Sequence, residues 1–260
     1  IPIVYRAGDQ PNNALSLNVL NTGEVAATGG TSGVFYAVSE MSSGKSTRVN
    51  NFVHVNYELE TPRVGKLLNI NGAGIQYRWL RNNMGNESYE AMNEKASNIE
   101  VGSEGVVVIP FGNGAERMFN NKTIGTHFLN LNLNIHNSAH LFRASLEGIA
   151  FSFVYGMECL KDDNATINVI RAGNDNLFRS EIFSNTVATL IGHEIEIYNT
   201  TGAVGAARAV GLKDGDYSKF GANVSDNDHV MTFLPLHNAA PYEAAYKKWK
   251  QELELILTNK

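Results

Sequence analysis

The chain has 260 residues, of which 43% are hydrophobic and 18% are charged, a composition typical of a folded protein. Its formal net charge of −5 argues against a nucleic-acid or anionic-membrane partner, because either would need a basic surface. No apolar run is long enough to span a bilayer, and the first residues do not resemble a signal peptide. We therefore expect no membrane partner.

Cysteine usage favours a reducing compartment. The single cysteine, Cys159, cannot form an intrachain disulfide, so we expect a cytoplasmic protein. Five Asn-x-Ser/Thr triplets arise by chance in a chain rich in asparagine, and they have no meaning in the cytosol.

The first candidate for a functional corner surrounds Asp9. The apolar run at residues 1–5 predicts a short strand, and Pro11 predicts the first turn of a helix that ends near Leu20. Asp9 then lies at a strand-to-helix corner, where its carboxylate can face a cleft. The alternative is that Asp9 only caps the helix, and spacing alone favours this alternative.

A glycine-rich turn follows. Residues 24–27 and 34–38 predict two strands of a hairpin, joined by Thr28-Gly29-Gly30-Thr31-Ser32-Gly33. Its small side chains, hydroxyls and backbone N–H groups permit close approach to a phosphate. An ordinary glycine-rich turn would have the same sequence, so both interpretations remain open here.

Residues 52–59 alternate as in a strand, and the run from Asn71 to Gly74 opens a helix that contains Gln76. Glycines at a helix start let the backbone approach a ligand, and they equally permit tight packing.

The second half of the chain alternates strands and helices. The strongest helical pattern spans residues 136–160, and its small residues predict close packing on another element. The alternation that follows predicts a sheet covered by helices, with parallel pairing near its centre. Residues 172–176 form a third small-residue corner at a strand end, where ligands of open α/β sheets tend to bind. The other expected elements are helices at 87–96, 177–190, 202–210 and 242–257 and strands at 106–110, 167–170 and 194–198.

Read in order, these segments resemble the second half of an FGGY-family carbohydrate kinase, and the resemblance covers essentially the whole chain. The matching motifs are Ala7-Gly8-Asp9-Gln10, Gly29-Gly30-Thr31-Ser32-Gly33, Pro110-Phe111-Gly112 with Gly114-Ala115-Glu116-Arg117, the helix Ala139–Gly148, Ala172-Gly173-Asn174, and Gly205-Ala206-Ala207.

The resemblance implies an α/β fold of the ribonuclease-H-like type found in the ATPase domains of actin, hexokinase and Hsp70. It implies transfer of the γ-phosphoryl group of Mg-ATP to a sugar hydroxyl, with ATP and Mg²⁺ as cofactors. Phosphoryl transfer needs positioning and charge stabilisation, with one carboxylate to accept the hydroxyl proton. The implied roles are Asp9 as catalytic base, Asp9 and Gln10 as sugar contacts, and Gly30, Thr31, Gly72, Gln76, Gly173, Asn174 and Asn176 as nucleotide contacts; no protein metal ligand is assigned.

The chain departs from the family pattern at several points. Gln10 stands where the family usually has asparagine beside the base, which leaves the sugar open. Arg171-Ala172 replaces two glycines of the adenosine corner, and this arginine could reshape the pocket or stack on adenine. The phosphate loop Asp-x-Gly-Thr of the family's first half does not occur.

We therefore expect residues 1–260 to be the C-terminal, nucleotide-binding domain of a two-domain kinase, partnered by an N-terminal domain of the same polypeptide and inactive alone. The expected acceptor is a pentulose, D-xylulose first. Glycerol, ribulose or fuculose remain alternatives, as does a non-catalytic actin-like nucleotide-binding module. A homodimer is possible.

Overall fold

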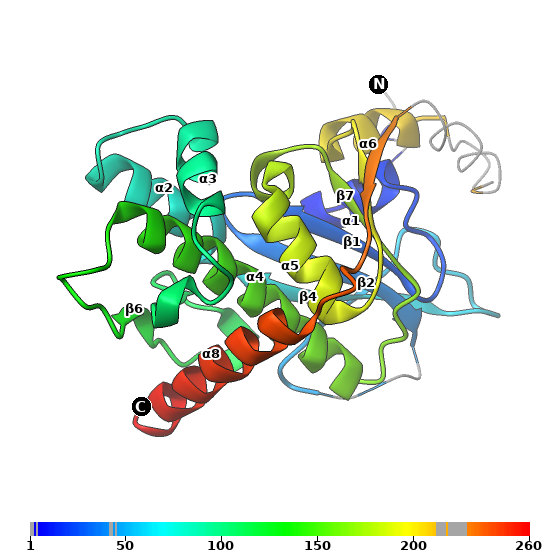
Figure 1. Ribbon diagram of the computed structural model, residues 1–260. Helices are drawn as coiled ribbons and strands as arrows, with labels where there is room; N and C mark the ends of the chain where they lie inside the picture. Colours follow the sequence, from blue (N-terminus) through cyan, green and yellow to red (C-terminus); the bar gives the residue numbers. More distant parts are fainter. Residues whose placement is uncertain (1–2, 4, 42–43, 45, 212–216, 218–227) are drawn as a thin grey trace.

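A seven-stranded sheet with the strand order β3-β4-β2-β1-β7-β8-β9 forms the centre of the computed structural model (Figure 1). A separate two-stranded sheet pairs β5 with β6. The structure describes residues 3, 5–41, 44, 46–211, 217 and 228–260. The strands are β1 (Glu24–Gly29), β2 (Gly33–Glu40), β3 (Asn50–Val53), β4 (Arg63–Ile70), β5 (Val107–Phe111), β6 (Gly125–Leu129), β7 (Val169–Gly173), β8 (Ile195–Tyr198) and β9 (His229–Phe233).

Helices lie between and around these strands. Figure 1 shows α1 and α6 beside one end of the large sheet, with α2, α3 and β6 on the far side of α4 and α5. The helices are α1 (Asp9–Ser16), α2 (Ala73–Asn83), α3 (Tyr89–Ser97), α4 (Ser138–Asp162), α5 (Glu181–Ile191), α6 (Gly202–Ala209) and α8 (Ala240–Thr258), with short 3-10 turns η1 (Ser103–Gly105), η2 (Glu116–Phe119) and η3 (Asn176–Arg179).

The centre of the sheet confirms the pairing expected from the sequence. β1 and β2 form an antiparallel hairpin in which Gly29 pairs with Gly33. β1 also pairs in parallel with β7, and β7 with β8. Because parallel neighbours end at the same edge of a sheet, the segments that follow β1, β7 and β8 begin side by side.

Helix α4 forms the middle of the hydrophobic core and is buried along most of its length. Small residues on its surface allow neighbours to approach closely. At Gly148 an added Cβ would overlap the carbonyl oxygen of Val108, so glycine lets β5 lie directly against the helix. The close packing expected from the sequence of α4 is thus confirmed.

Three strands were not expected from the sequence. β4 contains Lys66, a charged residue that breaks the apolar pattern of a buried strand. Its side chain is fully buried, and its Nζ lies 2.7 Å from Oδ2 of Asp163 after the end of α4. β6 is half-buried throughout, and β9 is a largely exposed edge strand, so neither shows the hydrophobic pattern of a buried strand.

Some element boundaries also differ from the expectation. α1 begins at Asp9 and ends at Ser16, and the strand expected at residues 52–59 is only Asn50–Val53. The expected helix 177–190 is divided into η3 and α5 at Ser180, whose side chain caps α5. Of the strand expected at residues 1–5, residues 1, 2 and 4 lie outside the described residues, and Ile3 and Tyr5 lie in no strand.

Candidate functional site

The turn after β1 and the corner after β7 meet at one edge of the sheet. Because Ala27 of β1 pairs in parallel with Ala172 of β7, the next residues of both strands emerge together. A Cβ added to Gly30 would lie 4.0 Å from Nδ2 of Asn176. Two of the three corners identified in the sequence are therefore direct neighbours.

These two segments line a cavity of about 350 Å³, which we call the corner cavity. Its volume falls within the range of small-molecule sites. The β1–β2 turn forms one end, α2, α3 and η3 form the walls, and α4 contributes one residue. The lining residues are Gly29, Gly30, Thr31, Gly74, Tyr77, Arg78, Tyr89, Glu90, Asn93, Leu146, Asn176, Leu177, Arg179 and Ser180.

The turn is held in place by the start of α2. The N–H of Gly74 donates to the carbonyl of Gly30 at 3.0 Å, and the N–H of Ile75 donates to the carbonyl of Thr31 at 3.1 Å. The N–H groups of Gly30 and Thr31 make no hydrogen bond within the described part of the chain. Both remain available to phosphate oxygens, as does the exposed hydroxyl of Thr31.

Gly173, the last residue of β7, is confined by its neighbours. A Cβ at this position would lie 3.1 Å from the carbonyl oxygen of Thr200, so a larger residue would push the ends of β7 and β8 apart. The next residue, Asn174, donates its N–H to the carbonyl of Tyr198 at 2.8 Å. Asn176 adopts a left-handed backbone with φ 46°, a conformation that asparagine tolerates. Of these corner residues, Asn176 lines the corner cavity.

Arg171 does not reach the corner cavity. Its Nε lies 2.8 Å from the carboxylate of Glu196, its Nη1 lies 3.4 Å from that of Glu24, and Nη1 also donates to the carbonyl of Asn18 at 2.8 Å. The substitution of glycine by arginine here therefore forms a network of ion pairs on the sheet. It neither lines this cavity nor offers a stacking surface inside it.

Asp9 is the exposed first residue of α1, and Gly8 occupies the N-cap position without a side-chain hydrogen bond. One carboxylate oxygen of Asp9 accepts the N–H of Gln10 at 2.9 Å. The other has no hydrogen bond within the described residues. Asp9 thus satisfies one N–H at the helix start and still presents a free oxygen, so both roles considered for it are compatible with its position.

α1 is anchored beside the corner cavity. Nδ2 of Asn13 donates to Oγ1 of Thr28, at the end of β1, at 2.9 Å. On its other side α1 lies against α6, where a Cβ at Gly205 would overlap the carbonyl of Asn12. These contacts fix Asp9 relative to the β1–β2 turn.

Gly72 and Gln76 do not line the corner cavity. They line a second cavity of about 390 Å³, together with Ile75, Trp79, Gly112, Asn113, Thr126 and Phe128. A Cβ at Gly72 would overlap the carbonyl oxygen of Pro110, so this glycine permits close packing of α2 on β5. Gln76 is 6% exposed and its Oε1 accepts the hydroxyl of Thr126 at 3.0 Å.

Several residues of the corner cavity were missed by sequence reasoning. The hydroxyl of Tyr77 donates to Oδ1 of Asn93 at 3.1 Å, and burial raises the pKa of this tyrosine. Tyr77 also stacks on Tyr89, with ring centroids 5.8 Å apart. Arg78 and Arg179 complete the polar lining. The helical spacing of Gly74, Tyr77 and Arg78 was the available signal, since these residues share one face of α2.

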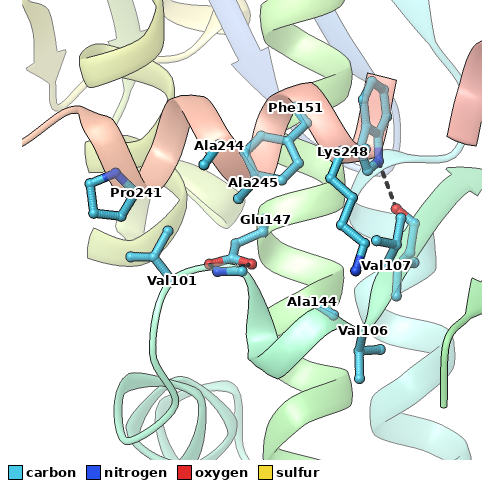
Figure 2. Close-up of a pocket in the computed structure, with 13 residues that line it drawn as sticks. Val101, Val106, Val107, Ala144, Glu147, Phe151, Pro241, Ala244, Ala245 and Lys248 are labelled. Carbon is cyan, nitrogen blue, oxygen red and sulfur yellow. Dashed lines mark hydrogen bonds between the residues drawn. The ribbon is translucent and has the colours of Figure 1, made fainter. Parts of the chain in front are cut away.

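A further cavity lies between α8, α4 and the segment before β5 (Figure 2). Glu147 points toward it, and its carboxylate accepts Nε–H of Arg143 at 2.6 Å, the N–H of Gly102 at 3.0 Å and the hydroxyl of Ser103 at 3.0 Å. Burial raises the pKa of Glu147. The indole N–H of Trp249 donates to the carbonyl of Val108 at 2.8 Å. The Trp249 contact joins α8 to the core, and none of the expected site residues lines this cavity.

No group of three or more His, Cys, Asp or Glu side chains within the described residues could hold a metal ion. Over the same residues, no helix has both the length and the apolar composition needed to cross a membrane.

The fold and the strand-end cavity define the class of protein: an α/β domain of the actin, hexokinase and Hsp70 type, with a ribonuclease-H-like core. Residues 25–211 match the C-terminal domain of the FGGY family of carbohydrate kinases, and the chain belongs to that family.

Individual relatives agree with this assignment. The chain is 27% identical to a xylulose kinase from Escherichia coli over 80% of this chain and 42% of that protein. It is 23% identical to a gluconokinase from Bacillus licheniformis over 98% of this chain and 50% of that protein. The chain thus spans about half the length of the curated relatives it matches.

Solved structures show the same fold. A xylulose kinase from Rhodospirillum rubrum superposes with a TM-score of 0.83 at 20% identity, covering 96% of this chain and 50% of that one. A glycerol kinase from Plasmodium falciparum, determined with ADP, superposes with a TM-score of 0.82 at 19% identity, again over 96% and 50%.

Proposed function

We propose that this chain is the nucleotide-binding domain of a kinase that transfers the γ-phosphoryl group of ATP to a sugar hydroxyl. The observation that carries the proposal is the corner cavity, where the N–H groups of Gly30 and Thr31, without a partner among the described residues, lie beside Asn176. A turn with free N–H groups suits phosphates, and a neighbouring asparagine suits the polar edge of a nucleoside.

The roles divide along the chain as follows in this proposal. Thr31 and Gly30 bind the β- and γ-phosphates, while Gly173, Asn174 and Asn176 form the adenosine corner. Asp9 accepts the proton of the attacking hydroxyl through its free carboxylate oxygen, and Gln10 contacts the sugar. The nucleotide role of Gly72 and Gln76 stays a prediction, since both line the neighbouring cavity.

The residues that line the corner cavity suit a nucleotide better than a metal ion held by protein ligands alone. The corner cavity offers hydroxyl, amide and guanidinium donors to an anionic nucleotide. Mg²⁺ usually keeps several waters and binds through substrate phosphates, so in this proposal it enters with ATP. When bound, it would neutralise negative charge on the phosphate oxygens.

We propose D-xylulose as the acceptor and D-xylulose 5-phosphate as the product. The xylulose kinases among the relatives support this choice, while the gluconokinase and glycerol kinase matches keep other acceptors open. The half-length coverage supports a partner domain, N-terminal in the same polypeptide, that supplies the remaining sugar contacts. A cytoplasmic location belongs to the same proposal.

Titration of ADP into the 260-residue chain tests the nucleotide site. We expect weak binding, with a dissociation constant on the order of millimolar or somewhat below, because half of the pocket belongs to the partner domain. Thr31→Val should weaken ADP binding several-fold by removing one phosphate hydrogen bond. Thr123→Val, which changes an exposed threonine outside the corner cavity, should leave it unchanged.

If ADP does not bind at millimolar concentration, or if the two threonine variants behave alike, the corner cavity is not the phosphate site. ADP binding combined with absence of sugar phosphorylation by the complete protein would instead favour a non-catalytic actin-like module.

A further inference from the structure

The two tyrosine rings that line the corner cavity already pack against other side chains. Tyr77 and Tyr89 stack on one another with ring planes 22° apart, and the guanidinium of Arg81 lies 5.2 Å from the centre of the Tyr89 ring. Tyr77 is also 4% exposed. A flat ligand entering the cavity would therefore not find a free tyrosine face.

Two planar guanidinium groups in the lining of the cavity have no side-chain partner among the described residues. Arg78 of α2 and Arg179 of η3 both line the cavity and are exposed, and neither side chain makes a hydrogen bond, ion pair or ring contact with the described residues. Glu90, on the third element of the wall, interacts electrostatically with Arg179 without forming an ion pair within 4 Å. The other arginines discussed above are held by carboxylates, carbonyls or rings.

The two arginines belong to two different walls of the corner cavity. α2 touches the phosphate turn through Gly74 and η3 approaches it through Asn176. Arg78 follows Gly74 by four residues of α-helix, and Arg179 follows Asn176 by three residues of 3-10 helix. At roughly 1.5 Å per residue, Arg78 lies about 6 Å further from the turn along α2. Arg179 comes directly after Leu177 and Phe178, which pack against Gly29 at the end of β1.

We propose that Arg78 and Arg179 hold the base of the bound nucleotide by stacking their guanidinium planes against its faces. This inference rests on the proposed function, because it takes the phosphates to lie at Gly30 and Thr31. A guanidinium is planar and weakly hydrated, and it stacks on aromatic faces in a way that an ammonium group does not. The two guanidinium groups would thus contact the base, because the tyrosine rings already stack on other side chains.

The competing explanation is that the arginines bind phosphate through charge. Lysine separates the two, because it preserves the positive charge and loses the plane. Adenosine separates them as well, because it contains the base without any phosphate. The pair of probes therefore reports on the end of the nucleotide that each arginine contacts.

The experiment is titration calorimetry of the 260-residue chain with ADP, adenosine and pyrophosphate. We expect Arg78→Met and Arg179→Met to weaken ADP and adenosine binding by roughly 3- to 30-fold each, the range of a cation–π contact. Arg78→Lys and Arg179→Lys should lose most of the same affinity, and pyrophosphate binding should change less than twofold. Lys247→Met, which removes an exposed charge on α8, is the control and should change none of the three.

Since neither arginine side chain makes a hydrogen bond, an ion pair within 4 Å or a ring contact with the described residues, thermal unfolding of all variants should match the parent, which excludes misfolding as the cause. If the methionine variants weaken ADP binding while the lysine variants retain full affinity, or if the methionine variants weaken ADP binding and leave adenosine binding unaffected, the stacking role is wrong and the charge explanation holds. If the parent binds ADP and the methionine variants bind it equally well, the proposed function survives and this inference fails. If the parent binds neither ADP nor adenosine, both fail.

Discussion

Gly74 at the start of α2 donates its N–H to the carbonyl oxygen of Gly30 at 3.0 Å, and no Cβ fits between them. The position of the β1–β2 turn therefore depends on the absence of a side chain at residue 74. The same turn presents the N–H groups of Gly30 and Thr31, which have no partner in the part of the chain that the structure describes. The packing of α2 against this turn therefore also determines the shape of the proposed phosphate site.

Gly74→Ala should displace the turn and weaken ADP binding at least tenfold. We also expect a loss of about 1–3 kcal/mol in the free energy of unfolding, as is typical of an overpacked contact. Denaturant unfolding and ADP titration measure the two effects. Gly156→Ala in α4 is the matched control. The added Cβ there would lie 3.6 Å from its nearest neighbour, so stability should stay equal or rise slightly. Equal behaviour of the two alanine variants would contradict this account of the turn.

The buried pair of Lys66 and Asp163 predicts a large stability effect. Lys66→Met leaves the carboxylate of Asp163 buried with the N–H of Ser46 as its remaining hydrogen-bond partner among the described residues, and we expect a loss of about 3–5 kcal/mol. The exposed pair of Lys95 and Glu87, with a similar separation of 2.6 Å, is the control. Lys95→Met should cost at most about 1 kcal/mol, because solvent screens the pair. Urea unfolding measures the free energy of unfolding of both variants. Similar losses of free energy in the two would contradict a special role for the buried pair.

We expect the free energy of unfolding to decrease in acid because of His54. Burial, together with the positive charge of Arg63, lowers the pKa of His54 from 6.5 to about 4. Above pH 6.5 the ring is neutral in both folded and unfolded chains. As pH falls below 6.5, His54 is protonated in the unfolded chain, but in the folded chain it stays neutral until pH is near 4. The free energy of unfolding therefore decreases across this window. Between pH 7 and pH 5 the contribution of His54 amounts to about 2 kcal/mol.

His54→Gln keeps a hydrogen-bonding partner for the hydroxyl of Tyr36, which lies 2.9 Å from Nδ1 of His54, and it removes the titration. Its free energy of unfolding should therefore fall less than that of the parent between pH 7 and pH 5. The same pH dependence in parent and variant would show that other groups control the acid response.

Sequence patterns predicted the parts of the fold that repeat apolar residues regularly. The hairpin around Gly30, the long helix α4 and the parallel centre of the sheet were expected and are confirmed. β4 was missed because its buried Lys66 resembles a surface residue until Asp163, far along the chain, is seen beside it. β6 and β9 were missed because half-buried and edge strands lack the apolar pattern of a buried strand.

The site shows the same division. Gly30, Thr31 and Asn176 come together because each follows a central strand, and strand ends are visible in a sequence. Arg78 and Arg179 were not anticipated, since on the sequence they look like ordinary solvated charges. Gly72 and Gln76 are separated from the corner cavity because they face β5 and β6 across α2, and the packing side of a helix depends on tertiary contacts.

The proposed phosphoryl transfer with Asp9 as the base is tested most directly by Asp9→Asn in the complete protein. Asparagine keeps the size of the side chain and its oxygen can still accept the N–H of Gln10, so folding and ATP affinity should stay close to those of the parent. It cannot accept a proton, so kcat for D-xylulose should fall by roughly two to four orders of magnitude. Turnover within a few-fold of the parent would show that Asp9 only stabilises the start of α1, and would contradict the proposed mechanism.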